Sequence, residues 1–459
     1  DRQHQIAFAG DGAFADVHDR DDARGLALAI AQGGKRVGGL ARLRNEDRQR
    51  ARRDGRFAIA ELAGDIDLDP DAGNLFVRCG ALIDGISDEV FHDRMVVIRD
   101  GRFSHIVDGD AAVRPSMTFL DLSDKTCLPG LINTHVHLAV KPEDSVDYSI
   151  YYTSSAEDHA RTALGFAETT LLTGFTTARN TGAFFPDAIA HAKSEVDAGR
   201  AIGPRIRNGG PYMTIPKGGG SLWVPYIDET DIPPESEMGM ASGPEEFRQR
   251  AEAAVAKGYD HLKVIASGAV FSFAEEPGAP EMSEEEIAAV VEVAHAAGIK
   301  VTAHAHSAQS GKDAIRAGVD SIEHASLFDD EVIAMAAEAG VAFSMDVYNG
   351  TYTDTVGREQ GYPEEYLQRN YDTTEAQRVV FEKAYAAGIT ILYGTDAGVL
   401  PHHMGGWQFD IMVERGMQPM DAIRSATSWP AEHLDISADV GAVEVGRLGD
   451  LIAVSGNPL

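Results

Sequence analysis

The sequence predicts an α/β protein: a closed (β/α)8 TIM barrel accompanied by a small β-sandwich that is formed from segments before and after the barrel. Two observations carry this prediction. Strand patterns alternate with helix patterns through eight cycles over about 300 residues, without hairpin turns between them, and such alternation favours a parallel sheet. Polar residues also follow several of these strands, and barrels build their active sites at the carboxyl ends of their strands.

Composition and strand patterns divide the chain into three parts. Residues 1–74 are rich in Asp, Arg, Ala and Gly and carry no motif, so we expect a weakly ordered segment, with a start site assigned too far upstream as an alternative. Residues 75–130 hold short strands separated by Gly, Asp and Asn, and residues 430–459 return to that texture; together they predict the β-sandwich. The barrel is expected over residues 131–429. We also expect further strands beyond Leu459.

Within the barrel, strands and helices follow one another in order. The strands are expected at residues 128–138, 174–180, 204–210, 259–268, 299–306, 319–325, 341–347 and 389–398. The helices are expected at residues 156–172, 187–196, 244–256, 282–298, a segment ending at 317, 329–339 and 374–387. The helix after residue 282 is the clearest, because Ser283 and Glu286 fit a capping box and Gly298 fits the position that follows a helix.

Composition excludes several classes of function. The 459-residue chain has a formal net charge of −32, which disfavours binding to nucleic acid or to anionic membranes. Its apolar runs fall short of the ~20 residues of a membrane span. We expect a soluble protein of undetermined compartment, either cytoplasmic, or periplasmic or secreted if a leader was removed. Cys79 and Cys127 are expected to be buried free thiols, with one disulfide as the alternative.

Histidines and an aspartate at strand ends form a candidate metal site. His135 and His137 end an apolar strand two residues apart, so their side chains point the same way. Neutral imidazoles suit Zn²⁺ and similar ions. Asp396, in the setting LYGTDAG, comes just after an apolar run, where an unpaired carboxylate is costly. His304 and His324 follow two further strands and would hold a second ion.

Lys263 is the unusual member of this set, because a protonated lysine cannot bind a cation. An amine that has reacted with CO₂ becomes a carbamate, which behaves as a bridging carboxylate. Taken singly, each residue has an ordinary alternative: a strand-end histidine is often structural, a lysine extends to solvent and an aspartate caps the next helix. Their joint occurrence at one end of the predicted barrel favours the metal site.

The motifs HVH, HLKV, AHAH, IEHA and GTDAG resemble those of the amidohydrolase superfamily in order and separation. IASGAV, FSFAEEPGAPEMSEEEI and AGVDSIEH are similar to its imidazolonepropionase-related branch, which includes metal-dependent Xaa-Pro and Xaa-Arg dipeptidases and ochratoxin-degrading amidohydrolases. The resemblance covers residue 75 to the end. It implies that one metal ion is held by His135, His137 and Asp396, a second by His304 and His324, and that both are bridged by carbamylated Lys263.

The activity that this resemblance implies is hydrolysis of the amide bond of a dipeptide or an N-acyl amino acid, with ochratoxin A-like compounds as candidate substrates. The implied cofactors are two divalent metal ions, Zn²⁺ by default and Mn²⁺ or Co²⁺ as alternatives, and the CO₂-derived carbamate. A metal-bridging hydroxide would attack the carbonyl, and Asp396 would carry a proton from water to the leaving amine. The expected partner is a small-molecule amide or dipeptide, and the resemblance also suggests a homo-oligomer.

One departure concerns the loop after the third strand. Many members of the branch carry a Gly-Gly-His element there, whereas this chain reads TIPKGGGSLW without a histidine. Other polar residues that could contact substrate are His306, Tyr348, His402 and His403.

Two other functions stay open. A mononuclear deaminase or imidazolonepropionase-like cyclic-amide hydrolase could use the same barrel, but AHSAQ after His304 lacks the Glu that such deaminases carry, and Lys263 has no role in a one-metal site. A non-enzymatic barrel that kept its metals is disfavoured by the complete ligand set.

Overall fold

The computed structural model describes residues 74–111, 113, 117–273 and 276–459. These residues form two compact units. The first, here called the sheet unit, comprises the described chain up to Ile132 together with Leu171–Thr176 and Pro419–Leu459; the second, the site unit, comprises Asn133–Thr170 and Thr177–Gln418. The expectation of a weakly ordered segment at residues 1–74 lies, except for its last residue, outside the described residues.

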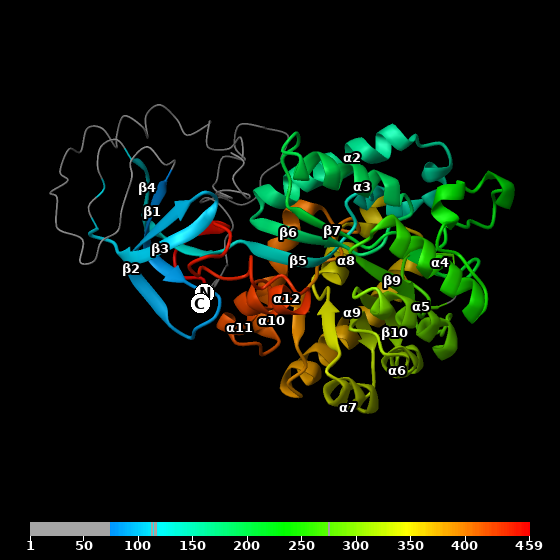
Figure 1. The fold of residues 1–459 in the computed structure, drawn as a ribbon. Helices are drawn as coiled ribbons and strands as arrows, with labels where there is room; N and C mark the ends of the chain where they lie inside the picture. The colour runs from blue at the N-terminus through cyan, green and yellow to red at the C-terminus, as the bar shows by residue number, and fades with distance from the viewer. Residues whose placement is uncertain (1–73, 112, 114–116, 274–275) are drawn as a thin grey trace. The chain divides into compact units, whose positions relative to one another are not determined.

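The sheet unit contains a five-stranded sheet in the spatial order β14, β4, β1, β2, β3 (Figure 1). The bounds of its strands are β1 Leu75–Ile83, β2 Val90–Arg99, β3 Arg102–Asp108, β4 Thr118–Pro129 and β14 Leu451–Ser455, and its helices are α11 Pro419–Ser425 and α12 Ser428–His433. β1 pairs antiparallel with β2 and parallel with β4, and β14 pairs antiparallel with β4. Val77 and Phe76 lie in two different buried apolar clusters, because successive strand residues face opposite sides.

Cys79 on β1 and Cys127 on β4 form a disulfide, so the prediction of free thiols is wrong. The parallel pairing of β1 with β4, including a register shift after Cys79, brings the two Cα atoms to 5.8 Å. That separation lies in the range that a disulfide spans. The two cysteines are 48 residues apart in the sequence, so only the strand pairing reveals their proximity.

Parallel strands alternate with helices in the site unit, although the residues Leu131–Ile132, Leu171–Leu172 and Phe175–Thr176, at the ends of three of these elements, belong to the sheet unit. One sheet has six strands in the order β13, β12, β11, β10, β9, β8, and another has three in the order β5, β6, β7. The strand bounds are β5 Leu131–Val136, β6 Phe175–Asn180, β7 Arg205–Asn208, β8 Tyr212–Met213, β9 His261–Ile265, β10 Lys300–Ser307, β11 Ser321–Leu327, β12 Ala342–Met345 and β13 Ile391–Tyr393. Asp396 N donates to His135 O and Asp260 N to Asn208 O, each at 2.9 Å. The first bond joins the segment after β13 to β5, and the second joins the residue before β9 to the end of β7. The α/β class is confirmed.

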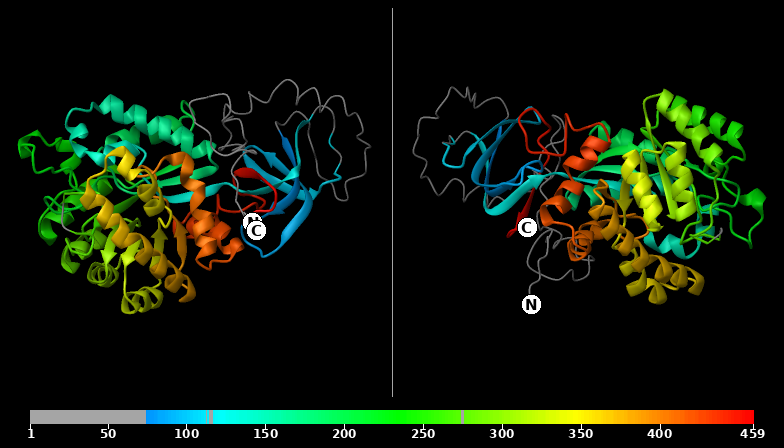
Figure 2. Two further views of the ribbon diagram at one scale, coloured as in Figure 1. Left: turned by 180° about the vertical axis from the view of Figure 1, so that it is seen from behind. Right: turned by 90° about the horizontal axis from the view of Figure 1, so that it is seen from below.

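Helices lie on the outer side of these strands (Figures 1 and 2). Their bounds are α2 Ala156–Leu172, α3 Pro186–Asp197, α4 Pro244–Lys257, α5 Glu284–Ala296, α6 Ala308–Ala317, α7 Asp330–Ala339, α8 Asn349–Gln360, α9 Glu364–Ala386 and α10 Gln408–Glu414. Small apolar residues at helical spacing face the strands: Ala163 and Ala167 on α2, and Ile189 and Ala192 on α3, share a buried cluster with Val136 of β5. This spacing places them on one face of each helix.

Local sequence signals predict most of these helices but not all. The capping box is confirmed, because the Ser283 side chain accepts from Glu286 N and the Glu286 side chain accepts from Ser283 N. Gly298 has φ +73°, the left-handed conformation expected after a helix. Helices α8 and α10 are not among the predictions, and α9 begins at Glu364, ten residues before its predicted start at Thr374. The first turns of α9 are mostly polar, so the buried face that contains Tyr366 is not evident from the sequence. In the described part of the chain, no helix has the length and apolarity of a membrane span.

Candidate metal centre and active site

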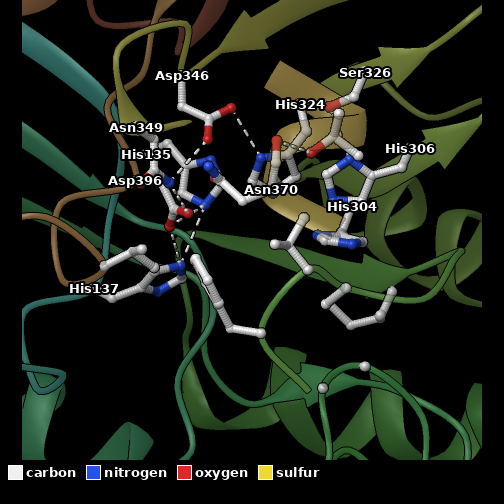
Figure 3. A pocket seen from close by; sticks show the side chains of 18 of the residues that line it. His135, His137, His304, His306, His324, Ser326, Asp346, Asn349, Asn370 and Asp396 are labelled. Carbon is white, nitrogen blue, oxygen red and sulfur yellow. Dashed lines mark hydrogen bonds and ion pairs between the residues drawn. The ribbon is translucent and has the colours of Figure 1, made fainter. Parts of the chain in front are cut away.

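A cavity in the site unit gathers the candidate ligands (Figure 3). The predicted site residues that line it are His135, His137, Lys263, His304, His306, His324 and Asp396. They come from β5, β9, β10, β11 and the segment after β13. Apolar and uncharged polar side chains complete the walls, among them Tyr148, Phe184, Tyr212, Phe271, Asn349, Asn370 and Thr373.

Three acceptor atoms converge at His135, His137 and Asp396. The Nε2 atoms of the two histidines are 3.2 Å apart, and Asp396 Oδ1 lies 3.4 Å from His135 Nε2 and 3.1 Å from His137 Nε2. The Nδ1 atoms face other acceptors, Glu323 Oε2 at 2.9 Å and Gly182 O at 3.3 Å, so the Nδ1 atoms carry the hydrogens. The Nε2 lone pairs and the carboxylate therefore point at one another, an arrangement that a cation stabilises.

The protonation of this cluster suits metal binding. Burial, followed by the nearby Lys263 charge, lowers the pKa of His135 to about 4, so its imidazole is neutral at pH 7. Burial opposes ionisation of Asp396, but the His135 and His137 rings outweigh it and the net pKa falls below its ordinary value. Neutral imidazole and ionised carboxylate are the forms that bind divalent cations.

The backbone around Asp396 is shaped to reach His135. Asp396 has φ +55°, a left-handed conformation that non-glycine residues rarely adopt and that is found at functional sites. Two residues earlier, a Cβ on Gly394 would lie 2.9 Å from the His135 Cβ and 2.1 Å from Ser344 Oγ. Glycine at this position thus lets the end of β13 pass close to β5.

A second cluster contains His304, His306 and His324, whose candidate ligand atoms lie within 4.8 Å of one another. His304 Nε2 is 3.2 Å from Gly268 O, which leaves Nδ1 as its lone-pair atom. His324 Nδ1 donates to Asp346 Oδ1 at 2.9 Å, which leaves Nε2 free to bind a cation. A carboxylate behind a metal-binding histidine fixes its tautomer and orientation, and Asp346 has this position.

His135 is supported from behind by a buried ion pair. Glu323 Oε1 accepts from Arg179 Nη2 at 2.5 Å, and its other oxygen faces His135. Burial opposes the charge on Glu323, but Arg179 and His135 outweigh it and the net pKa of this carboxyl falls well below its ordinary value. In a regular strand Glu323 and His324 would face opposite sides, but His324 has φ +71°, so that alternation ends there and both side chains serve the site.

Lys263 is buried, with an exposed fraction of 1%. Among the described residues, no hydrogen-bond partner reaches its Nζ atom. Burial lowers the pKa of the amine to about 8. An unpartnered buried amine is costly. A covalent group on the nitrogen that interacts with the surrounding histidine site would remove this cost.

The sequence model of the amidohydrolase family matches residues 126–459. The chain belongs to the amidohydrolase family. Ochratoxinase from Aspergillus niger is 28% identical over 346 residues, covering 72% of this chain and 70% of that protein. Imidazolonepropionase from Symbiobacterium thermophilum is 24% identical over 394 residues, covering 78% and 82%.

Solved structures agree with this assignment. A Xaa-Pro dipeptidase crystallised with methionine in its active site superimposes with a TM-score of 0.78 and 33% identity, covering 84% of this chain and 94% of that one. The predicted superfamily and branch are confirmed, and these neighbours have folds of the TIM-barrel type. The amidohydrolase is therefore a hydrolase that acts on C–N bonds, and its histidine clusters are candidate sites for divalent metal ions.

Of three predicted substrate contacts, the structure places one on the cavity and two elsewhere. His306 lines the cavity of the amidohydrolase, and its Nδ1 lies 2.9 Å from Ser326 Oγ. Tyr348 and His402 are not among the described residues that line it. The Tyr348 ring contacts Trp407 with ring centroids 5.7 Å apart, and the His402 ring stacks on Phe166 at 4.5 Å.

Sequence reasoning missed the residues that hydrogen-bond to the candidate ligands and to their neighbours. These are Arg179, Glu323, Asp346, Asn349 and Gln377. Two of these residues could have been recognised from their position in the sequence. Glu323 lies inside a buried strand and Asp346 directly follows one, the same setting that drew attention to Asp396.

Proposed function

We propose that the amidohydrolase is a binuclear metal-dependent enzyme that cleaves the amide bond of dipeptides or N-acyl amino acids. The observation that carries this proposal is that candidate ligand atoms converge in three overlapping groups on one cavity. A buried lysine that has no hydrogen-bond partner among the described residues lies on the same cavity. His135, His137 and Asp396 would hold one ion, His304 and His324 the other, with Zn²⁺ the expected metal. When bound, such a pair supplies an activated water and polarises the substrate carbonyl.

Lys263 would join the two sites as a carbamate. Burial favours the neutral amine, and only the neutral amine has a lone pair that can add to CO₂. The addition forms an N–C bond and releases one proton, which leaves an anionic carboxylate on the side chain. This modification would provide two oxygen ligands for cations on the Lys263 side chain.

Asp396 would act as the proton carrier. Its Oδ1 faces the two Nε2 atoms, where water would be activated, and its Oδ2 accepts from Asn349 Nδ2 at 3.0 Å. An amine is a poor leaving group until it is protonated, so a carboxylate that accepts the proton of water and returns it to nitrogen serves both halves of hydrolysis.

The substrate class and the architecture extend this proposal. Similarity to an ochratoxinase and to a Xaa-Pro dipeptidase supports an amide next to an amino acid. We infer that eight strands, β5, β6, β7 and β9 to β13, close into one barrel, which the bonds from Asp396 to His135 and from Asp260 to Asn208 support. The domain boundaries stay predictions: a β-sandwich of residues 75–130 with 430–459, and a barrel of residues 131–429. A homo-oligomeric state also stays a prediction.

Metal analysis combined with a substrate panel tests the proposal. We expect two metal equivalents per chain, loss of hydrolysis after chelation and its return with Zn²⁺. The panel contains Xaa-Pro and Xaa-Arg dipeptides and aromatic N-acyl amino acids, including ochratoxin A. One equivalent together with deamination or cyclic-amide hydrolysis would support the mononuclear alternative instead. No hydrolysis of any panel member by the two-metal protein would contradict the proposal.

Replacing Glu323 by glutamine is expected to weaken metal retention by about 10- to 100-fold, because carboxylates behind ligating histidines contribute that much. The change keeps the side-chain volume but removes the charge facing His135 and Arg179. Transfer of metal to a chromogenic chelator measures the effect. Glu338→Gln, at an exposed position on α7, is the matched control and should retain metal like the parent; equal retention in both variants would argue against the supporting role.

A further inference from the structure

The hydrogen on His137 Nδ1 has two neutral acceptors within reach. Tyr212 Oη lies 3.1 Å from this nitrogen, and Gly182 O lies 3.3 Å from it. The other ring nitrogen, Nε2, faces Asp396 Oδ1 (Figure 3), so Nδ1 is the nitrogen that carries the hydrogen when Nε2 binds a cation. A phenol is neutral at pH 7, and its oxygen can accept a hydrogen bond. Tyr212 is therefore a residue of the cavity wall that contacts a candidate ligand directly.

Tyr212 is the better placed of the two acceptors. Gly182 O is shared, because it also accepts from Asn180 Nδ2 at 2.9 Å. Among the described residues, the Tyr212 hydroxyl has a single hydrogen-bond partner, which is His137 Nδ1. The unshared acceptor is also the closer one, and N–H···O hydrogen bonds weaken as they lengthen beyond about 3.2 Å. The distances therefore favour Tyr212 as the main acceptor of the His137 hydrogen.

The Tyr212 ring is held in place by its neighbours. Tyr212 is the first residue of β8 and pairs with Lys263 of β9, which fixes its backbone. Gly182 has φ +80°, and a Cβ at this glycine would lie 2.5 Å from Tyr212 Cδ1, so glycine permits the close approach of the ring. The ring packs edge-on against Phe184, with centroids 5.0 Å apart. A ring fixed in this way presents its hydroxyl to His137 without a further loss of side-chain freedom.

The histidines at positions 135 and 324 have charged acceptors instead. Glu323 Oε2 lies 2.9 Å from His135 Nδ1, and Asp346 Oδ1 lies 2.9 Å from His324 Nδ1. Loss of a carboxylate behind a ligating histidine weakens metal binding by about 10- to 100-fold. Hydrogen bonds to a neutral acceptor have roughly half the strength of those to an ionised one. A phenol behind His137 should therefore contribute about 3- to 10-fold, the square root of that range.

We propose that Tyr212 is a positioning residue for the metal ion at His135, His137 and Asp396: its hydroxyl accepts the Nδ1 hydrogen of His137 and so directs the Nε2 lone pair at the ion. This inference rests on the proposed function, since it assumes that an ion binds there. Without the hydroxyl, the longer contact to Gly182 O alone would orient the ring. One of the two ions would then be held less tightly, while the other would be unaffected.

The variant Tyr212→Phe tests the assignment, because it removes the hydroxyl and keeps the ring that packs against Gly182 and Phe184. Metal retention is measured by transfer from the two-zinc protein to a chromogenic chelator. We expect one equivalent to be held about 3- to 10-fold more weakly than in the parent, and the other to be held equally well. A merely structural defect would weaken both equivalents alike. Equal weakening of both, or no weakening, would overturn the inference.

The matched control is Tyr148→Phe. Tyr148 lines the same cavity, and its ring also contacts Phe184, with centroids 5.7 Å apart. Among the described residues, its hydroxyl hydrogen-bonds to none of the candidate ligands. This variant should retain both equivalents like the parent. The same selective weakening in Tyr148→Phe would show that loss of any hydroxyl of the wall has this effect, and would contradict a specific role for Tyr212.

Nuclear magnetic resonance of the zinc-loaded protein with ¹⁵N-labelled histidine gives a readout beyond metal retention. In the parent, the Nδ1–H signal of His137 should show a contact to the Tyr212 ring protons. This signal should move upfield in Tyr212→Phe, because its hydrogen bond is weaker. The corresponding signals of His135 and His324 should stay in place. An unmoved His137 signal would contradict the assignment.

The spectrum of the parent also separates the remaining outcomes. If Tyr212→Phe does not fold, as judged by thermal unfolding, the contact between His137 Nδ1–H and the Tyr212 ring in the parent decides alone, and its absence would overturn the inference. If the protein binds one equivalent of zinc, the proposed binuclear function fails, and the same contact still tests Tyr212.

Discussion

Replacing Asp396 by asparagine is expected to lower kcat by about 10²- to 10⁴-fold, the range for loss of a general acid–base group. The amide keeps the volume of the carboxylate and can still face His135 and His137, but it cannot take up and return a proton. Steady-state kinetics on the best substrate of the panel measures the effect, and metal analysis of the same preparation shows how much metal is retained.

The control for this prediction is Asp372→Asn, which changes an exposed carboxylate on α9. Its kcat should equal that of the parent. Asp396→Asn should unfold at a temperature close to that of the metal-free parent, because the substitution is nearly isosteric. A metal-retaining Asp396→Asn protein with near-normal kcat would rule out the proton-carrying role.

Replacing Lys263 by methionine is expected to lower kcat/KM by more than about 100-fold and to remove one metal equivalent. Removing residues that only support ligands costs about 10- to 100-fold, and a bridging ligand contributes more directly. The metal-free variant should be at least as stable as the metal-free parent, because methionine fills the space without burying an unpartnered amine. A loss of activity without a loss of stability separates the chemical role from a structural one.

A second measurement addresses the carbamate itself. Parent enzyme reconstituted with ¹³C-bicarbonate should give a carbamate carbon signal that is absent from Lys263→Met and present in Lys257→Met, a variant at an exposed lysine. Reconstitution without CO₂ should yield a less active parent enzyme that recovers when bicarbonate is added. Full activity without CO₂ would argue for an unmodified lysine.

The sequence predicts the candidate ligands because each is marked locally. His135 and His137 have the two-residue spacing of a strand, and Lys263, His304, His324 and Asp396 each follow or end an apolar run. The α/β class follows from the same alternation. In both cases the information lies within a few residues of the position concerned.

The residues that sequence reasoning missed depend on contacts between distant segments. Arg179 meets Glu323 across 144 positions, and Asn349 meets Asp396 across 47. Nothing near Asn349 in the sequence distinguishes it from a surface residue at the start of a helix. The left-handed φ of His324 likewise could not be read from IEHA, because single non-glycine residues adopt it only where surrounding structure requires it.

The bridge between Cys79 and Cys127 has a consequence for the unfolded protein. Closing a loop across 48 positions reduces the number of conformations open to the denatured chain, and this favours the native sheet over the disordered ensemble. Reductants remove that advantage for the sheet unit, where both cysteines lie. The redox potential of the surroundings is thus one of the variables that determine the stability of this five-stranded sheet.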